Sequence, residues 1–236
     1  MQYAYLTAGL MMLCVWITLF ILRKDLRREM IIMSLIAAPL GLFDFIAVPL
    51  YWEPVTMFGS LYNIENILYT FSLGGISAVL YTEVARKAPR HMHTWHKSAA
   101  LIVGAVTIAV LVTFVLQGRF NPAVVLYLGL LSGLAVSLYL RPDLVRGTII
   151  GALCFGVIYF TALKIWMTIF PGAVEWFAFV GMPQIYVWGI PLWELTFGII
   201  FAAYWGNIYE ILFGYRLVNL PVKRKKAQQK RTRKRA

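Results

Sequence analysis

Long apolar runs separated by short polar segments fill the chain up to residue 213. A helix that crosses the hydrocarbon core of a bilayer, roughly 30 Å thick, needs about 20 mainly apolar residues. Runs of this kind occur at residues 3–22, 30–51, 62–85, 98–117, 123–140, 147–170 and 190–213. The pattern therefore predicts an all-α membrane protein whose seven apolar runs form transmembrane helices.

The composition agrees with this pattern and separates the net charge from the apolar part of the chain. Hydrophobic residues make up 61% of the 236 residues and charged ones 14%, whereas soluble domains average roughly 45–50% apolar residues. The net charge of +12 is concentrated in the run KRKKAQQKRTRKRA near the C-terminus. We therefore expect a membrane domain at 1–221 and a disordered basic tail at 222–236 that binds anionic lipid headgroups. No nucleic-acid partner is expected.

The distribution of basic residues also predicts an orientation. With seven spans the connecting segments alternate between the two sides, and 20 of the 22 Lys and Arg residues then fall on one side. The other two are Arg119, on the opposite side, and Lys164, inside the sixth span. Because cytoplasmic segments carry the excess of Lys and Arg, we expect a multi-pass protein of the cell membrane with its N-terminus outside and its C-terminus in the cytoplasm.

Half of the ten acidic residues map to the outer half of the spans or to the outer surface. They are Asp44, Glu53, Glu65, Glu175 and Glu194. Asp44 lies about 10 Å and Lys164 about 9 Å from the outer ends of their helices, at a rise of about 1.5 Å per residue. Ionisable side chains inside a membrane usually face the bundle interior and pair with one another. Asp44 and Lys164 are therefore interpreted either as a structural ion pair or as a pair that lines a polar cavity and tunes a neighbouring acid.

Glu65 and Glu194 lie close to the outer ends of the third and seventh spans. Helical spacing places Tyr69 on the same face as Glu65, and Phe201 and Trp205 on the same face as Glu194. If the two faces meet, they enclose a pocket with a carboxylic acid near its mouth and aromatic rings below. The alternative is an interfacial role, because the helix dipole favours Glu in a first turn and aromatic residues are common at membrane boundaries.

The two halves of the chain share an order of features. In each half the second span ends with Pro-x-x-x-Glu, at Pro49–Glu53 and Pro171–Glu175, and the third span begins with a glutamate. We therefore predict two three-helix pseudo-repeats, 1–86 and 123–216, joined by a linking helix at 98–117. In membrane proteins built from such repeats, the binding site commonly lies between the halves.

The stretches IENILYTFSLGGISAVLY in the first half, and IPLWELTFG and WGNIYE in the second, resemble the integral-membrane lycopene cyclases, the heterodimeric and fused carotenoid cyclases. That family carries a Pro-x-Glu-Glu/Asp signature at a helix start. The matching segments here are 63–66 (NIEN) and 191–194 (PLWE). Each segment keeps one carboxylate of the pair, with Asn66 and Trp193 in the other position, and Asn63 replaces the proline of the first. The chain is therefore identified as a divergent member of the family.

The resemblance implies an enzyme that protonates the end of a polyene and closes a ring without net redox change. Protonating a carbon–carbon double bond requires an acid that stays protonated, and a coupled pair of carboxylates is one way to achieve this. If the pair is rebuilt between the halves, Glu194 is the general acid and Glu65 its partner. The residues expected to bind the substrate are Tyr69, Phe201, Trp205, Asn66 and Trp193. If the pair is absent, the fold persists without the reaction.

The leading hypothesis is thus a cyclase or isomerase, an intramolecular lyase, that acts on the end group of a carotenoid or another isoprenoid. The alternatives are a non-catalytic membrane protein that binds a polyene or lipid, and a small-molecule transporter. The sequence indicates no cofactor and no metal site, since Cys14 and Cys154 lie in apolar runs without metal-ligand spacing. Whether a reduced flavin or nicotinamide is needed stays open, as does the oligomeric state.

Overall fold

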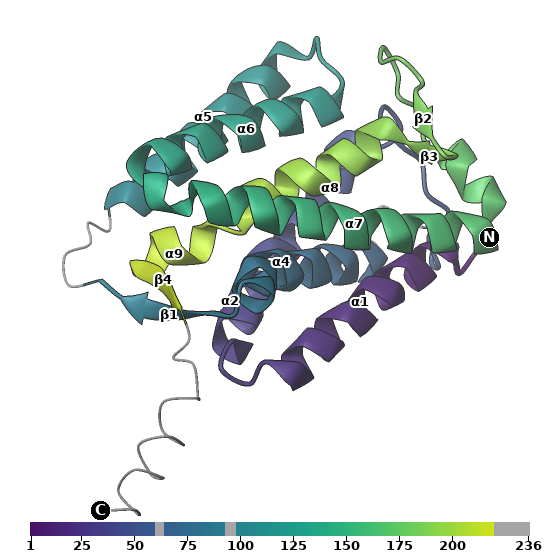
Figure 1. Ribbon diagram of the computed structural model, residues 1–236. Coiled ribbons are helices and arrows are strands. Elements are labelled where there is room, and N and C mark those ends of the chain that lie inside the picture. Colours follow the sequence, from purple (N-terminus) through teal and green to yellow (C-terminus); the bar gives the residue numbers. More distant parts are fainter. Residues whose placement is uncertain (60–63, 93–97, 220–236) are drawn as a thin grey trace, which may run out of the picture.

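The protein is a bundle of long helices with short strands at its two ends (Figure 1). The computed structural model describes residues 1–59, 64–92 and 98–219, so Asn63 and the predicted basic tail lie outside the described residues. The α-helices are α1 (Ala4–Leu22), α2 (Arg27–Ala37), α3 (Asp44–Ala47), α4 (Ile64–Val84), α5 (Ser98–Gln117), α6 (Pro122–Leu140), α7 (Val145–Ile169), α8 (Leu192–Trp205) and α9 (Ile208–Phe213). The 3-10 helices are η1 (Ala38–Phe43), η2 (Pro142–Leu144) and η3 (Pro171–Trp176).

Seven helical segments of the described residues are long and apolar enough to cross a membrane. They are Ala4–Leu22, Arg27–Ala47, Ile64–Val84, Ser98–Gln117, Pro122–Leu140, Pro142–Ile169 and Leu192–Phe213. The prediction of a helical bundle with seven helices able to span a membrane is therefore confirmed. Two of these spans are interrupted, because the second contains η1 and α3 and the last consists of α8 and α9.

Prolines shorten and break the second span. α2 ends at Ala37, and Pro39 lies in the first turn of η1, which leads directly into α3. α3 ends because Val48 is extended, with φ −82° and ψ 136°, as is usual for a residue that precedes proline. The span was predicted to reach Tyr51. Instead it ends at Ala47, and Tyr51 lies in the following loop.

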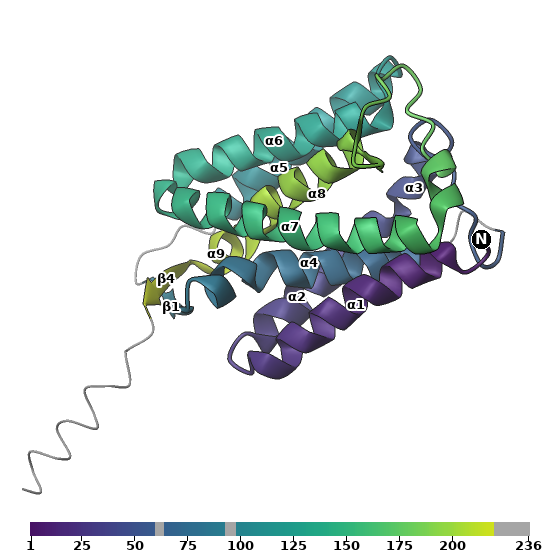
Figure 2. The same ribbon diagram turned by 45° about the vertical axis from the view of Figure 1, so that its right-hand side comes forward.

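α4 and α8 form the centre of the bundle (Figures 1 and 2). α4 contacts α1, α2, α7 and α8, and α8 also contacts α6 and α7. Close approach to α2 requires a residue without a side chain, since a Cβ at Gly74 would lie 2.3 Å from the Cβ of Ala37. Small residues allow membrane helices to approach in this way. α4 is accordingly the most enclosed of the seven spans, and α5, which packs mainly on α6, is the least.

Two small antiparallel sheets mark opposite ends of the bundle. β1 (Lys87–His91) pairs with β4 (Tyr215–Asn219), and β2 (Tyr186–Val187) pairs with β3 (Ile190–Pro191). We call these the β1–β4 end and the β2–β3 end.

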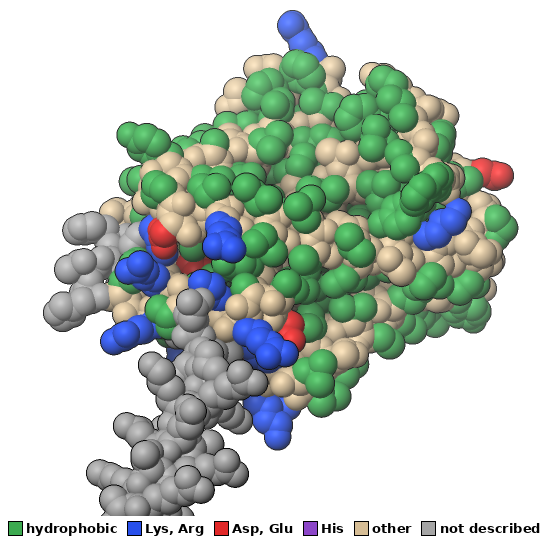
Figure 3. All heavy atoms as spheres, viewed as in Figure 1, with side chains coloured by type: hydrophobic (Ala, Val, Ile, Leu, Met, Phe, Trp, Pro, Cys, Tyr) green, Lys and Arg blue, Asp and Glu red, His purple; other side chains and the backbone are tan. Residues whose placement is uncertain are grey.

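In the view of Figure 3, most Lys and Arg side chains gather at the β1–β4 end. There Arg23 forms salt bridges of 2.8 and 2.6 Å with Asp25 and Glu83, and its hydrogen bonds lower the pKa of Asp25.

At the β2–β3 end, the loops that follow the second helix of each half lie against each other. The backbone N–H of Glu53 donates to the carbonyl of Trp176 at 2.7 Å, and that of Ala178 donates to the carbonyl of Tyr51 at 3.0 Å. An isolated antiparallel bridge joins Trp52 to Phe177. The paired loops hold Tyr51 by its main chain.

Candidate functional site

The carboxyl group of Glu194 lies at the centre of a buried cluster of hydroxyl groups. Glu194 is in the first turn of α8 and is only 8% exposed. The hydroxyl of Tyr51 donates to its Oε2 at 2.6 Å, and the hydroxyl of Tyr159 donates to its Oε1. Both carboxyl oxygens are therefore bound by tyrosines. Tyr51 comes from the loop after α3 and Tyr159 from α7, so the two donors belong to different halves of the chain.

Two further tyrosines extend this cluster. The hydroxyl of Tyr69, on α4, donates to the hydroxyl of Tyr159 at 2.7 Å. Tyr127, on α6, donates to the carbonyl of Trp193 at 2.5 Å and also interacts with Tyr51. Burial, followed by the neighbouring carboxylate of Glu194, raises the pKa of Tyr51 well above its usual value. Tyr51 therefore keeps its proton and acts as a donor.

The sequence of α8 creates room for this arrangement. Gly198 follows Glu194 by one helical turn, and a Cβ at this position would lie 2.4 Å from Cδ1 of Tyr159. The glycine thus leaves room for the ring of Tyr159 against α8, next to Glu194. On its own helix Tyr159 stacks on Phe155, with ring centroids 5.6 Å apart. Its position is consequently fixed by packing as well as by its hydrogen bonds.

Asp44 belongs to the same buried group of carboxyls. It is 3% exposed and accepts hydrogen bonds from the hydroxyl of Tyr5 at 3.4 Å and from Nε1 of Trp52 at 3.0 Å. The Tyr5 hydroxyl lies within electrostatic range of Asp44, Glu194 and Glu65. One hydroxyl group is thus influenced by three carboxyl groups from α3, α8 and α4.

The structure does not bring Asp44 and Lys164 together. Lys164 is exposed on α7, and its Nζ donates to the carbonyl of Trp188 at 2.7 Å. The salt bridges found within 1–59, 64–92 and 98–219 do not include an Asp44–Lys164 pair. Asp44 faces the interior, whereas the lysine runs along the outside of its helix to a loop carbonyl, as long basic side chains near helix ends do.

Glu65 is completely buried, at 0% exposure. Its Oε1 accepts a hydrogen bond of 2.6 Å from the backbone N–H of Met57. For its Oε2, no hydrogen-bond partner occurs among the described residues. Glu65 and Glu194 therefore bind different groups, although both act on Tyr5. The neighbouring Asn66 has a structural contact, because its Nδ2 donates to the carbonyl of Gly41 at 2.7 Å.

The other predicted substrate-binding residues take different positions. Trp193 donates through Nε1 to the carbonyl of Pro183 at 2.7 Å, and its ring stacks on Tyr127 at a centroid distance of 6.4 Å. Phe201 and Trp205 stack on each other at 5.4 Å with an interplanar angle of 11°. They are buried further along α8, towards the β1–β4 end. Of the five predicted residues, Tyr69 alone binds a partner of Glu194 directly.

A small cavity adjoins the tyrosine cluster. It has a volume of about 10 Å³ and is lined by residues of α1, α4 and α7, among them Met11, Met12 and Trp166. This volume corresponds to roughly one water molecule. The hydroxyl-bearing residues that line it are Tyr69 and Tyr159. The rest of the lining is apolar, so the cavity places the hydrogen-bonded network of Glu194 next to apolar side chains of α1, α4 and α7.

Sequence reasoning missed the tyrosines that surround the glutamate. Tyr51, Tyr127 and Tyr159 were not among the predicted site residues, nor was Tyr5. One signal could have found Tyr159: it lies far inside a span, where a hydroxyl needs a hydrogen-bond partner. No group of three or more His, Cys, Asp or Glu that could hold a metal ion occurs in the described part of the chain.

Fold and site together define a polytopic membrane protein with a buried carboxyl group held between two halves. A model of the family described as lycopene cyclase matches residues 121–212. This region spans α6 to α8 and most of α9, and it includes Tyr127, Tyr159 and Glu194. This part of the chain is therefore similar to the lycopene cyclases, and the predicted resemblance is confirmed there. Tyr51 and Glu65 lie outside the matched region. No curated protein and no solved structure matches the chain.

Proposed function

We propose that this protein is a membrane-embedded carotenoid cyclase or double-bond isomerase with Glu194 as its general acid. The observation that carries the proposal is the position of Glu194. Its carboxyl group is buried inside the region that matches the lycopene cyclase family, and residues of both halves bind it. A positioned side chain that transfers a proton in the transition state commonly accelerates a reaction by about 10²- to 10⁴-fold.

The proposed reaction needs one group to give and take back a proton. Glu194 protonates a carbon–carbon double bond at the end of the polyene, which leaves a carbocation and a carboxylate. Ring closure forms a new carbon–carbon bond, and the cation then loses a proton from an adjacent carbon to the carboxylate. Atoms and electrons balance without a redox partner, and the product is an isomer of the substrate. Without ring closure, the same two proton transfers move a double bond.

The tyrosines provide hydrogen bonds for the transferred proton and aromatic rings near the proposed cation. A protonated Glu194 can donate to Tyr159, which in turn can donate to Tyr69, so the hydroxyl network is satisfied in both protonation states of the acid. Tyr69 and Tyr159 line the cavity next to the site, and their π faces stabilise a nearby cation. Glu65 is the second carboxyl of the proposed site, and like Glu194 it lies within electrostatic range of the Tyr5 hydroxyl.

We further propose the repeat architecture and orientation expected from the sequence. In support of the repeats 1–86 and 123–216, α4 packs on α1 and α2 as α8 packs on α6 and α7, and the two corresponding loops pair through backbone atoms. The helix at 98–117 is then the link. The basic residues at the β1–β4 end support a cytoplasmic location for that end. The cell membrane is the proposed location.

The test is expression of the wild-type chain in a host that accumulates lycopene, followed by pigment analysis. A new cyclic or isomerised carotenoid is expected. An unchanged pigment profile, with the protein present in the membrane, would overturn lycopene as the substrate. The same assay with other acyclic isoprenoids then distinguishes a different substrate from the absence of catalysis.

Replacing Glu65 by glutamine is expected to lower conversion by about tenfold or more in this assay. The substitution keeps the size of the side chain and removes the second carboxyl group of the proposed site, and one tenfold step corresponds to roughly 1.4 kcal/mol. The matched control is Glu53→Gln, because Glu53 is an exposed carboxylate of the same half. Equal conversion by the two variants would remove Glu65 from the site.

Tyr159→Phe is expected to reduce conversion by roughly 10- to 100-fold, because a hydrogen bond to a charged group contributes about 1.5–3 kcal/mol. The change removes the contact with Glu194 and with Tyr69 and leaves the ring in place. The optimum pH of conversion should also move, since Glu194 loses a donor. Tyr139→Phe is the control, as Tyr139 is 84% exposed. A Tyr159→Phe variant that behaves like the control would show that the network has no part in the reaction.

A second candidate is a membrane protein that binds a polyene without converting it. The observation in its favour is that Glu194 is enclosed by tyrosines and that the adjoining cavity is small. This candidate predicts pigment that copurifies with the protein and is recovered unchanged. The transporter hypothesis relied on a path lined by Asp44 and Lys164, which the structure does not bring together, so we do not propose it.

A further inference from the structure

Two buried glutamates lie at the β1–β4 end, far from Glu194 along the bundle. Glu29, in the first turn of α2, and Glu210, in α9, are each 2% exposed. Both carboxyl oxygens of Glu29 and Oε2 of Glu210 are buried without a hydrogen-bond partner among the described residues. Burying a carboxylate without compensation is costly. Each of these carboxyl groups is therefore stable in its buried position only with a bound cation or with a proton.

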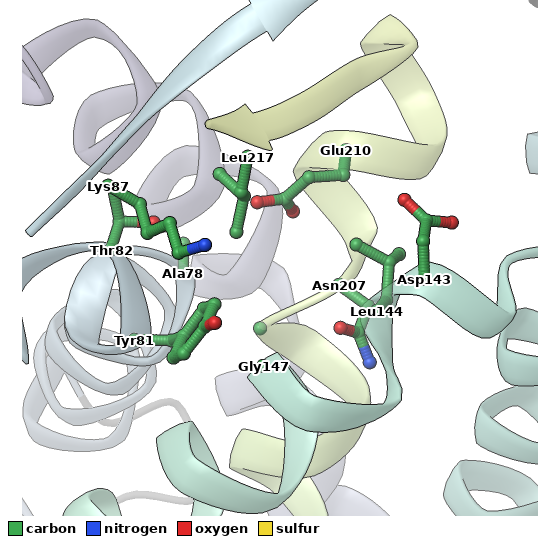
Figure 4. Close-up of a pocket in the computed structure, with 11 residues that line it drawn as sticks. Ala78, Tyr81, Thr82, Lys87, Asp143, Leu144, Gly147, Asn207, Glu210 and Leu217 are labelled. Carbon is green, nitrogen blue, oxygen red and sulfur yellow. The ribbon is translucent and has the colours of Figure 1, made fainter. Parts of the chain in front are cut away.

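A cavity of about 60 Å³ opens beside Glu210 (Figure 4). Its lining includes Thr82 and Tyr81 of α4, Lys87 of β1 and Asn207 between α8 and α9. In Figure 4 the side chains of Glu210 and Lys87 point towards the cavity from opposite sides. The hydroxyl of Thr82 is also buried without a hydrogen-bond partner in the described part of the chain. A space of this size and polarity holds on the order of four water molecules.

The charged groups that face the two glutamates come from several elements. Arg23, Asp25 and Glu210 act on Glu29, and Arg141 and Asp143 act on Glu210. Tyr209 of α9 also lies within electrostatic range of Glu29, and Lys87 lines the cavity.

These cations are mostly engaged elsewhere. Arg23 forms salt bridges with Asp25 and Glu83, and Arg141 forms one of 2.7 Å with Asp143. The salt bridges within the described ranges include neither Glu29 nor Glu210.

We propose that Glu29 and Glu210 form a proton-binding pair, in which Glu210 exchanges protons with water in the cavity that it lines. The step is simple: a carboxylate takes a proton from hydronium and becomes a neutral carboxylic acid, with water as the other product. A neutral acid is suited to a buried position and needs no counter-charge. A metal cation fits less well, because the ammonium group of Lys87 lines the same cavity and repels it.

The pair would make the contact between the halves sensitive to proton concentration. Glu29 belongs to the first half and Glu210 to the second, so loss of both protons would place two like charges between them in a region of low dielectric constant. This role is separate from the proposed catalysis at Glu194. It predicts a titratable acid site even in a variant that converts no substrate.

Infrared spectroscopy of the full-length protein in liposomes tests the proposal, because the C=O stretch of a protonated carboxyl is distinct from the bands of a carboxylate. We expect a band that decreases as the pH is raised, shifts in heavy water, and is lost in part in Glu29→Gln and in Glu210→Gln. Glu83→Gln is the matched control, since Glu83 lies at the same end and pairs with Arg23. If neither substitution changes the protonated-carboxyl band, the proposal is wrong.

A labelling experiment on the wild type covers the case in which a variant fails to fold. Dicyclohexylcarbodiimide adds to protonated carboxyl groups in apolar surroundings and leaves a stable N-acylurea that mass spectrometry can locate. Labelled Glu29 or Glu210, with labelling that falls as the pH rises, supports the proposal. Protection by Na⁺ at constant pH and ionic strength, with choline as the reference cation, would overturn it in favour of a metal-ion site.

Discussion

Glu194→Gln is expected to abolish conversion of the isoprenoid substrate, with a loss on the order of 10²- to 10⁴-fold. Glutamine matches the size of glutamate and can still accept a hydrogen bond from Tyr51 or Tyr159, but it has no acidic proton to give to a double bond. The measurement is pigment analysis in a host that accumulates the substrate. Because every step of the proposed reaction passes through this carboxyl group, no other single substitution should have so large an effect on activity.

The matched control is Glu175→Gln. Glu175 is an exposed carboxylate at the same end of the bundle, in η3, and its loss should leave conversion unchanged. Thermal unfolding of both variants in detergent should resemble that of the wild type, which separates a chemical defect from a folding defect. Residual conversion by Glu194→Gln at the level of Glu175→Gln would exclude Glu194 as the acid. Copurified, unconverted pigment in the wild type would favour the binding protein instead.

Gly41→Ala is expected to cause the largest loss of stability among the conservative substitutions, about 1–3 kcal/mol. An added Cβ would lie 2.8 Å from Cα and from N of Ile67 and 2.9 Å from the carbonyl carbon of Asn66. These are backbone atoms of α4, which cannot turn aside as a flexible side chain can. η1 and α4 must therefore separate, and the hydrogen bond from Asn66 to the carbonyl of Gly41 is strained or broken.

Gly104→Ala provides the control for this prediction. Gly104 lies within α5, and nothing lies within 4 Å of a Cβ built at that position. Alanine should therefore be neutral there or should stabilise the helix by up to about 1 kcal/mol. The measurement is the unfolding temperature of both variants in the same detergent. If Gly41→Ala unfolds at the same temperature as Gly104→Ala, η1 and α4 are not packed as described.

The spans could be predicted from the sequence because a bilayer imposes a simple requirement of length and polarity. The predicted ends of α5 agree with the structure at both residues, Ser98 and Gln117. The largest error at a C-terminal end concerned the second span, where Pro49 forces the preceding residue into an extended conformation and ends α3 early. Hydropathy does not register this effect, since Val48, Pro49 and Leu50 are all apolar.

The site was predictable in part. The sequence indicated Glu194 and Glu65 because a carboxylate in an apolar helix is conspicuous. It did not indicate Tyr51 or Tyr159, since tyrosine is common in membrane proteins, and which tyrosines converge depends on how the helices turn about their axes. Whether Glu194 serves as the acid is still a prediction.

The predicted pairing of Asp44 with Lys164 also depended on the direction of side chains around the helix axis, which the sequence does not give. Their depths in the membrane match, and depth is what counting residues from a helix end measures. The direction of a side chain around the helix axis is set by packing instead. Lys164 is exposed while its neighbours Leu163 and Trp166 are buried, so one step along α7 separates the lipid-facing side from the interior.

The main-chain pairing of the loops at the β2–β3 end has a consequence for how the chain can vary during evolution. Tyr51 is held in place by bonds between its carbonyl and the N–H groups of Ala178 and Phe179, and these bonds do not depend on which side chains the loops carry. Either loop can therefore diverge in sequence while the geometry around Glu194 is kept. For the same reason, the two halves could be encoded as separate polypeptides and still assemble one acid site between them.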